Sequence, residues 1–297
     1  MKAVLIRTAY FFTKGETVMK KLVYIALALC LLVGTLALSS CGGAAKIAVP
    51  NDTTNEARAL MLLEAQGIIK LKAGVGIGAT VLDITENPYN IKFYEAEAAS
   101  LPRVLDDVDY AVINTNYAIA AGINPLTDAL AMENSASAYA NIIAVKAGHE
   151  NDAKIKALVA AMKSSEIADY INANYGGAAI SVVDDVTNGY DASIDYASLS
   201  GANIKIAASP VPHAEILEIA KRILAAKGIT LEIIVFSDYI IPNQVVDEGE
   251  CDANYFQHVP YLNDFNANNG TGLVSVCEIH VEPMGIYSSK HDTLIGK

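Results

Sequence analysis

Three aromatic rings, one imidazole and two amides lie within eight residues, from Asn254 to Tyr261. If this stretch is extended, Phe256 and His258 point to one face, because side chains alternate along a strand. Such a group could wall a small pocket that is apolar inside and polar at its edge. An aromatic core cluster beneath a loop explains the same residues, and composition alone does not choose between the two.

Arg58 is a second candidate for ligand chemistry. Apolar residues recur at helical spacing over 55–66, and Thr53 with Glu56 matches a capping box, which predicts a helix start here. A cation in the first turns opposes the helix dipole, so we expect Arg58 to have an anionic partner. The alternatives are a surface arginine that contacts Glu56 or solvent, and an arginine aimed at a ligand carboxylate in bidentate geometry.

Predicted strands and helices alternate along the chain, which indicates an α/β fold with mostly parallel sheets. Asn114 ends a strand that is apolar throughout, and open parallel sheets bind ligands at the carboxyl ends of their strands. Residues 176–202 are acidic and rich in Tyr and Ser, and we expect a connector with little ordered structure. Strands are predicted over 46–49, 79–83, 91–95, 110–114, 139–145, 203–207, 231–236 and 273–281, and helices over 55–66, 97–106, 152–170, 212–226 and 242–248.

The composition sets limits on size and partners. A chain of 297 residues that is 53% hydrophobic can build one large or two medium domains. The net charge is −12, and without the first 40 residues 16 Lys and Arg face 32 Asp and Glu, a net charge of −16. Such an acidic chain is a poor ligand for polyanions, so we expect no nucleic-acid partner.

The N-terminal region has the pattern of a secretory signal. A basic segment at 19–21 precedes an almost wholly apolar run over 22–37, which is shorter than the roughly 20 residues of a spanning helix. The closing Leu-Ser-Ser-Cys resembles a lipobox, in which Cys41 is lipidated and becomes the mature N-terminus; an uncleaved anchor is the alternative. We expect a start-site extension over 1–18, a signal peptide over 19–40 and a lipidated tether over 41–45, hence an extracytoplasmic protein anchored to the cell membrane by lipid.

Cys251 and Cys277 remain after the signal is removed. They could form a disulfide in an oxidising compartment or stay as two separate buried thiols.

Several stretches together resemble the methionine-binding lipoproteins of ABC importers, a branch of the type II periplasmic-binding-protein fold. They cover nearly all of the mature chain except the connector. The order of the segments along this chain differs from that in the family. In the family, the segment that resembles 203–287 comes first, and the segment that resembles 46–175 follows it. The matching stretches are Pro210 to Leu217, Phe236 to Tyr239, Pro242 to Gln244, Asp252 to Tyr261, Glu282 to Tyr287, Pro50 to Leu60, Glu86 to Pro88, Leu101 to Arg103 and Asn114 to Ala118.

The resemblance therefore implies a circularly permuted two-lobed fold with a ligand cleft between the lobes. We expect lobe 1 over 46–116, completed by 284–297, and lobe 2 over 117–283, including the connector. Crossings between the lobes are expected near 114–122 and 282–287, with residues 46 and 297 as neighbours. The alternative is a fragment of a tandem gene whose halves pair with another copy.

The resemblance also implies the site and its partners. Arg58 is similar to the family's carboxylate clamp, and Asn55 and Asn114 to the partners of the amino acid's backbone groups. The side-chain pocket would consist of Tyr239, Phe256, His258 and Tyr261, whose aromatic edges suit a thioether. The expected ligand is methionine, D or L, for delivery to an ABC permease, with no cofactor.

Three other functions are alternatives to methionine binding. One is binding of another apolar amino acid or a Met-containing dipeptide. A second is metal capture, although the five histidines lack tight ligand spacing. The third is catalysis, which we do not expect, because no nucleophile-elbow, HExxH or P-loop pattern is present.

Overall fold

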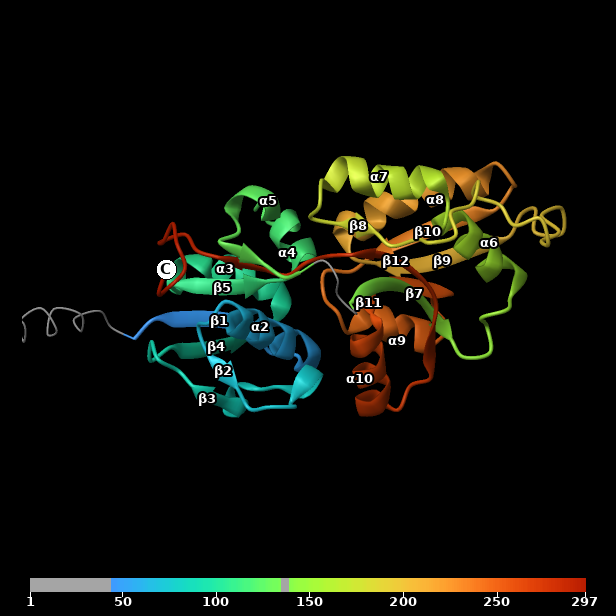
Figure 1. Ribbon diagram of the computed structural model, residues 1–297. Coiled ribbons are helices and arrows are strands. Elements are labelled where there is room, and N and C mark those ends of the chain that lie inside the picture. The colour runs from blue at the N-terminus through green and yellow to red at the C-terminus, as the bar shows by residue number, and fades with distance from the viewer. Residues whose placement is uncertain (1–43, 135–138) are drawn as a thin grey trace, which may run out of the picture. The chain divides into compact units, whose positions relative to one another are not determined.

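Two sheets, each with helices packed against it, organise the chain (Figure 1). The computed structural model describes residues 44–134 and 139–297, and residues 45–297 form one unit by their contacts. The expected extension over 1–18, the signal peptide over 19–40 and the lipidation site Cys41 lie outside the described residues. Within the described ranges, no helix is long and apolar enough to span a bilayer.

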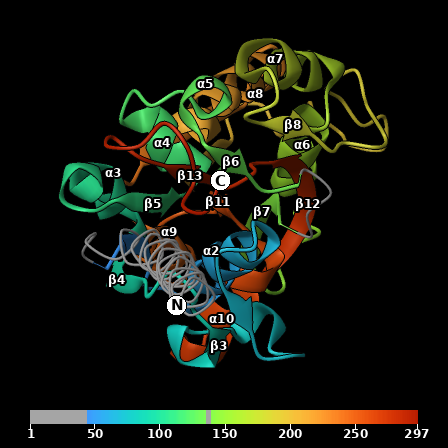
Figure 2. The ribbon, with the colours of Figure 1, turned by 60° about the vertical axis from the view of Figure 1, so that its left-hand side comes forward.

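The first sheet has five strands in the order β4-β1-β5-β13-β6. β1 is parallel to β4 and β5, whereas β13 lies antiparallel between β5 and β6 (Figure 2). Its strands are β1 (Lys46–Pro50), β4 (Lys92–Ala96), β5 (Tyr110–Ile113), β6 (Ala131–Met132) and β13 (Gly285–Tyr287), and its helices are α2 (Thr53–Ala65), α3 (Leu101–Val104), α4 (Thr115–Ala120) and α5 (Pro125–Asp128). A separate antiparallel pair joins β2 (Lys70–Leu71) to β3 (Ile84–Glu86).

The second sheet has six strands in the order β10-β9-β11-β7-β12-β8. Helices α6, α7 and α8 share a buried cluster with one face of it, and α9 and α10 share a second cluster with the other face (Figure 1). The strands are β7 (Ala140–Lys146), β8 (Ile180–Ser181), β9 (Asn203–Ala208), β10 (Thr230–Val235), β11 (Ala253–His258) and β12 (Leu273–Val281). The helices are α6 (Ala153–Met162), α7 (Ser165–Tyr175), α8 (Glu215–Ala225), α9 (Ile241–Asp247) and α10 (Val259–Asn269).

Both sheets follow one plan. β1 lies between β4 and β5 as β9 lies between β10 and β11, and the next position holds an antiparallel strand that arrives from the other sheet. That inserted strand is β13 in the first sheet and β7 in the second. The chain therefore crosses between the sheets twice, from β6 to β7 and from β12 to β13, which is the expected two-lobed α/β architecture.

The expected lobe boundary at 116/117 is wrong. β6 pairs with β13, with Met132 opposite Gly285, so residues 117–132 belong to the first lobe. The first crossing therefore lies between Met132 and Ala140 rather than at 114–122. β6 has only two residues, too few to show an apolar run or an alternation. The sequence therefore did not predict β6, nor that the first lobe extends to it. The second crossing, between Val281 and Gly285, lies inside the expected range.

Local patterns explain most of the remaining elements. β5 is buried at all four positions and β7 at six of seven, as continuous apolar runs in central strands predict. The N-cap of helix α2 is Asp52, one residue before Thr53, which the capping box predicted. The Asp52 side chain accepts from the Asn55 amide at 3.0 Å. The prediction of a strand over 79–83 is wrong. Residues 81–83 form a 3-10 helix instead, in which the Asp83 carboxylate accepts a hydrogen bond from the Thr80 amide at 3.0 Å.

The connector over 176–202 has little regular secondary structure, as expected, but its side chains pack against the second lobe. β8 pairs with β12, and Tyr190, Ile194, Tyr196 and Leu199 pack against the core of the second sheet. The Tyr190 hydroxyl donates to the Ile223 carbonyl at 3.1 Å. Tyrosine rings bury apolar area while their hydroxyls find polar partners, which needs no periodic pattern.

Segments close to the two ends of the described chain both contact Asp109 in the first lobe. Asp109 accepts from the Lys46 amide through Oδ2 at 2.7 Å, and its Oδ1 lies 3.3 Å from Nε2 of His291. The His291 ring also stacks on Tyr110 with centroids 5.1 Å apart. One carboxylate thus joins the start of β1 to the segment that follows β13. Cys251 and Cys277 are both free thiols.

We predict that Tyr190→Ala lowers the free energy of unfolding by about 1–3 kcal/mol, because it removes partly buried ring area and one hydrogen bond. Denaturant unfolding measures this. Val186→Ala, in the same connector but at a side chain that is 49% exposed, is the control and should change stability by less than about 0.5 kcal/mol. Equal, negligible effects would mean that the connector contributes nothing to the core.

Candidate functional site

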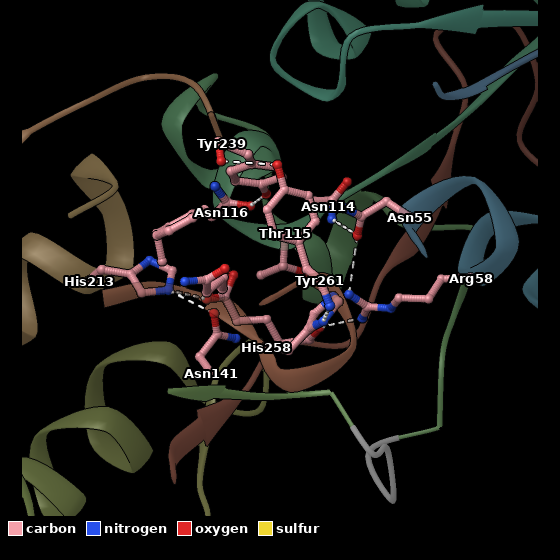
Figure 3. Close-up of a pocket in the computed structure, with 13 residues that line it drawn as sticks. Asn55, Arg58, Asn114, Thr115, Asn116, Asn141, His213, Tyr239, His258 and Tyr261 are labelled. Carbon is pink, nitrogen blue, oxygen red and sulfur yellow. Dashed lines mark hydrogen bonds and ion pairs between the residues drawn. The ribbon is translucent and has the colours of Figure 1, made fainter. Parts of the chain in front are cut away.

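All seven residues proposed from the sequence line one pocket: Asn55, Arg58, Asn114, Tyr239, Phe256, His258 and Tyr261 (Figure 3). They come from α2, from the end of β5, from β11 and the start of α10, and from the loop before α9, so both lobes contribute. Six further residues complete the wall: Thr115, Asn116, Asn141, His213, Gln257 and Glu282. The free volume is about 20 Å³, which is room for about one water molecule.

Arg58 is buried, with 4% of its surface exposed, and its anionic partner is Glu133. Nε and Nη2 donate to the two carboxylate oxygens at 3.2 and 2.6 Å, a bidentate contact. The guanidinium also lies over the Tyr139 ring, 4.3 Å from its centroid. The interpretation of Arg58 as a surface residue paired with Glu56 is therefore wrong; Glu56 instead accepts from the Val81 amide at 2.9 Å.

The same ion pair joins the two crossings. Arg58 Nη2 donates to the Glu282 carbonyl at 3.2 Å, and Glu133 Oε2 accepts from the Met284 amide at 3.1 Å. Glu133 precedes β7, whereas residues 282–284 connect β12 to β13. A guanidinium and a carboxylate thus hold together the two segments that link the lobes.

One edge of the guanidinium remains available to a ligand. Arginine has five N–H donors, and those on Nε and Nη2 are used by Glu133 and the Glu282 carbonyl. Among the described residues, Nη1 has only a long contact of 3.5 Å to Asn55 Oδ1. An incoming carboxylate would therefore meet Nη1.

The two asparagines are held in a fixed relative orientation. Asn55 donates to Asp52 Oδ1 at 2.8 Å, and its own Oδ1 accepts from Asn114 Nδ2 at 2.8 Å. Burial raises the pKa of Asp52, against the hydrogen bonds from Asn55. Asn114 Oδ1 is buried and has no hydrogen-bond partner among the described atoms. A buried acceptor without a donor is costly, so this oxygen suits an N–H group of a ligand.

The aromatic residues form one cluster on the opposite wall. The rings of Tyr239, Phe256 and Tyr261 have centroids 5.8–6.0 Å apart. The Tyr239 hydroxyl donates to Asn116 Oδ1 at 2.7 Å, and so links the aromatic lobe to α4. The pairing of β11 with β7 is irregular between Tyr255 and Gln257, so the strand does not alternate as expected. Phe256 and His258 nevertheless both line the pocket, and both are buried.

His258 caps α10 with its imidazole. Its Nδ1 accepts from the Tyr261 amide at 3.2 Å, which places the proton of the neutral ring on Nε2. Burial, followed by the positive charge of Arg58, lowers the pKa of His258 well below its usual value of 6.5. The ring is therefore neutral at pH 7.

A buried polar network beneath the pocket was missed from the sequence. His280 Nε2 lies 2.7 Å from Glu282 Oε1, and His213 Nε2 lies 2.9 Å from Asn141 Oδ1. Burial lowers the pKa of each of these two histidines to about 3. His213 and Glu282 lie in the stretches Pro210 to Leu217 and Glu282 to Tyr287, which resemble the family, but separate motifs do not reveal that the two residues converge.

A larger cavity, of about 300 Å³, adjoins the pocket and shares Tyr239 and Tyr261 with it. Asp52, Asp238 and the exposed Ile240 also line this cavity.

Comparison with known proteins gives a family and several relatives. The model of a family described as NlpA lipoprotein matches residues 37–183 and 204–295. Membrane lipoprotein TpN32 of Treponema pallidum is 51% identical over 133 residues, 45% of this chain and 50% of that protein. D-methionine-binding lipoprotein MetQ of Escherichia coli is 44% identical over 137 residues, 46% and 51% of the two chains. This chain thus spans about half the length of the curated relatives it matches.

Among solved structures, a nutrient binding protein from Burkholderia cenocepacia bound to methionine is 53% identical. The match covers 47% of this chain and 59% of that one, with a TM-score of 0.45.

We predict that Glu133→Gln lowers the free energy of unfolding by about 3 kcal/mol, because it leaves a buried guanidinium without its counter-charge. The matched control is Glu86→Gln, whose ion pair with Lys70 is more than 60% exposed on both sides and should contribute less than about 1 kcal/mol. Chemical denaturation compares the two variants. Similar small losses for both would show that the Arg58 pair does not hold the crossings.

Stability should depend on pH through His258. The unfolded imidazole takes up a proton below about pH 6.5, whereas the folded one does not, so acid favours unfolding. Relative to His258→Asn, which keeps an N-cap but cannot titrate, the wild type should lose up to about 1.4 kcal/mol per pH unit below 6.5. Unfolding free energies at pH 7.5 and 5.5 measure the difference. Parallel pH profiles for the two proteins would contradict a neutral, buried His258.

Proposed function

This chain belongs to the NlpA lipoprotein family, and from that premise and the pocket geometry we propose that it binds methionine, D or L, between its two lobes. The observation that carries the proposal is one pocket in which Arg58 and Asn114, from the first lobe, face the rings of Tyr239, Phe256 and Tyr261. The relatives named above include a D-methionine-binding lipoprotein, which supports the same ligand.

Each part of methionine has a chemically matched wall. The carboxylate fits the free Nη1 edge of Arg58, and the ammonium group fits the partnerless Oδ1 of Asn114. The thioether fits among the aromatic rings, where a sulfur contact with a ring edge contributes about 0.3–1.5 kcal/mol. A buried zwitterion is tolerated only when both charges find partners, and this pocket offers polar groups at one end and rings at the other.

Binding needs movement of the lobes or of the wall. A pocket of about 20 Å³ holds about one water molecule, far less than an amino acid. Two lobes joined by two crossings can open about those segments and close again around a ligand. The adjoining cavity of about 300 Å³ is the route that such opening would widen.

The proposal extends to the cellular role. The chain would be anchored by lipid at Cys41 on the outer side of the cell membrane and deliver its ligand to an ABC permease, acting by binding rather than by catalysis. Support comes from the lipobox-like residues 38–41 and from the family, whose description is that of a lipoprotein.

We also propose that the fold is circularly permuted and self-contained. Support comes from the single strand plan of both sheets, and from the meeting of Lys46 and His291 at Asp109. The residues that the family model leaves unmatched, 184–203, lie almost wholly within the connector. A fragment that pairs with another copy is the competing account, and a monomeric mass in solution would exclude it.

A second candidate function is metal capture. The ligand atoms of His213, His280 and Glu282 lie within 4.8 Å of one another, a cluster that sequence spacing did not reveal. Two neutral imidazoles and a carboxylate suit zinc. Titration with Zn²⁺ alone tests this function separately from methionine.

Calorimetry of the purified protein with L- and D-methionine tests the main proposal. We expect binding of at least one stereoisomer, and an affinity at least tenfold lower for Arg58→Ala and for Asn114→Ala, because each removes a partner of a buried charge. Lys70→Ala, on the surface of the first lobe, is the control. Absence of heat with both stereoisomers in the wild type would contradict the proposal.

A further inference from the structure

Glu282 is a buried carboxylate at the pocket wall to which the proposed binding of methionine gives no role so far. It follows β12 in the second crossing and is 8% exposed. Burial raises its pKa, while His213, Arg58 and a hydrogen bond from the Asn116 amide act in the opposite direction. A carboxylate placed at such a cost in a ligand pocket calls for an explanation.

A directed chain of hydrogen bonds ends on Glu282. The Tyr255 hydroxyl lies within hydrogen-bond distance of His280 Nδ1, and His280 Nε2 lies 2.7 Å from Glu282 Oε1. If Tyr255 donates to the imidazole, the neutral ring carries its proton on Nε2 and donates it to the carboxylate. Both Tyr255 and His280 are fully buried, so the chain holds Glu282 in one orientation.

When it is ionised, Glu282 has no cation of its own. Among the described residues, only His213 and His280 lie within ion-pair distance of its side chain, and both rings are neutral at pH 7. Arg58 is the nearest permanent cation in the pocket, but Glu133 already binds its guanidinium through two oxygens.

Glu282 also has acceptor capacity left. A carboxylate can accept about four hydrogen bonds, and the His280 ring, the Asn116 amide and the 3.3 Å contact from His213 account for three at most. Because Glu282 lines the pocket, its remaining acceptor position is available to a ligand.

We propose that Glu282 is the counter-ion of the ligand's ammonium group, and that His280 and Tyr255 are positioning residues that hold it there. The proposal rests on the function proposed above and deepens it. Asn114 Oδ1 offers the ammonium a neutral acceptor, and Glu282 adds the full charge that a buried cation needs. The site therefore selects α-amino acids over carboxylates that have the same side chain but lack the amino group.

Calorimetry with two ligands tests the selection in the wild type. The probes are L-methionine and 4-(methylsulfanyl)butanoic acid, which keeps the carboxylate and thioether and lacks only the ammonium. We expect methionine to bind at least 100-fold more tightly. Affinities within threefold of each other would overturn the proposal, without any need for a variant.

Three variants locate the selection in Glu282. Glu282→Gln should weaken methionine binding at least 30-fold and change binding of the deaminated acid less than threefold. Tyr255→Phe, which removes only the hydroxyl, should reduce the preference for methionine about three- to tenfold, again at unchanged affinity for the deaminated acid. Glu278→Gln, at an exposed position of β12, should leave both affinities unchanged. Equal losses for both ligands in the Glu282 or Tyr255 variants would indicate a structural role and overturn the proposal.

Two other outcomes have distinct meanings. If the wild type binds neither methionine nor the deaminated acid, the proposed function itself fails. If methionine binds to the wild type only when Zn²⁺ is added and a chelator abolishes it, the cluster of His213, His280 and Glu282 is a metal site and Glu282 is not the ammonium's counter-ion.

Discussion

A single buried ion pair, Arg58 with Glu133, is the interaction on which the arrangement of the lobes depends. The guanidinium reaches the Glu282 carbonyl as well as Glu133, and Glu133 reaches the Met284 amide. Both segments that connect the lobes therefore meet at one pair of charges. A buried pair of this kind contributes little net stability, but the loss of one partner is costly, so the geometry is strongly specified.

This constraint also shapes the pocket. Because Glu133 binds Nε and Nη2, Nη1 is the nitrogen of Arg58 with the weakest contact among the described residues, 3.5 Å to Asn55 Oδ1, beside the Asn55–Asn114 pair. The aromatic cluster of the other lobe faces these polar groups, and the Tyr239 hydroxyl reaches across to Asn116. A ligand that binds here must be charged at one end and apolar at the other. Arg58, which contacts both connecting segments, thus also supplies the cation of the polar half of the site.

Much of this could be predicted from the sequence where the signal is local. The apolar runs of β5 and β7 predicted buried strands. The aromatic stretch of β11 suggested a pocket wall, and Phe256 and His258 do line the pocket. The resemblance of short motifs brought all seven site residues to one pocket. These features depend on residues close in sequence or on motifs that are specific as a set.

Other features depend on contacts between residues far apart in the chain, and the local sequence around each residue did not predict them. Glu133 lies 75 residues from Arg58, and β6 is a two-residue strand defined only by its pairing with β13. His213, His280 and Glu282 converge from two distant segments. The tyrosines of the connector pack on the core without any period. Each of these features is defined by tertiary contacts, which a short stretch of sequence does not reveal.

A crystal structure of the protein with free L-selenomethionine tests the central claim most directly, because the anomalous signal of selenium locates the ligand without ambiguity. Ligand captured between the lobes should place selenium among the rings of Tyr239, Phe256 and Tyr261, with its carboxylate at Nη1 of Arg58. Selenium bound elsewhere on the protein, or a carboxylate among the rings, would contradict the account.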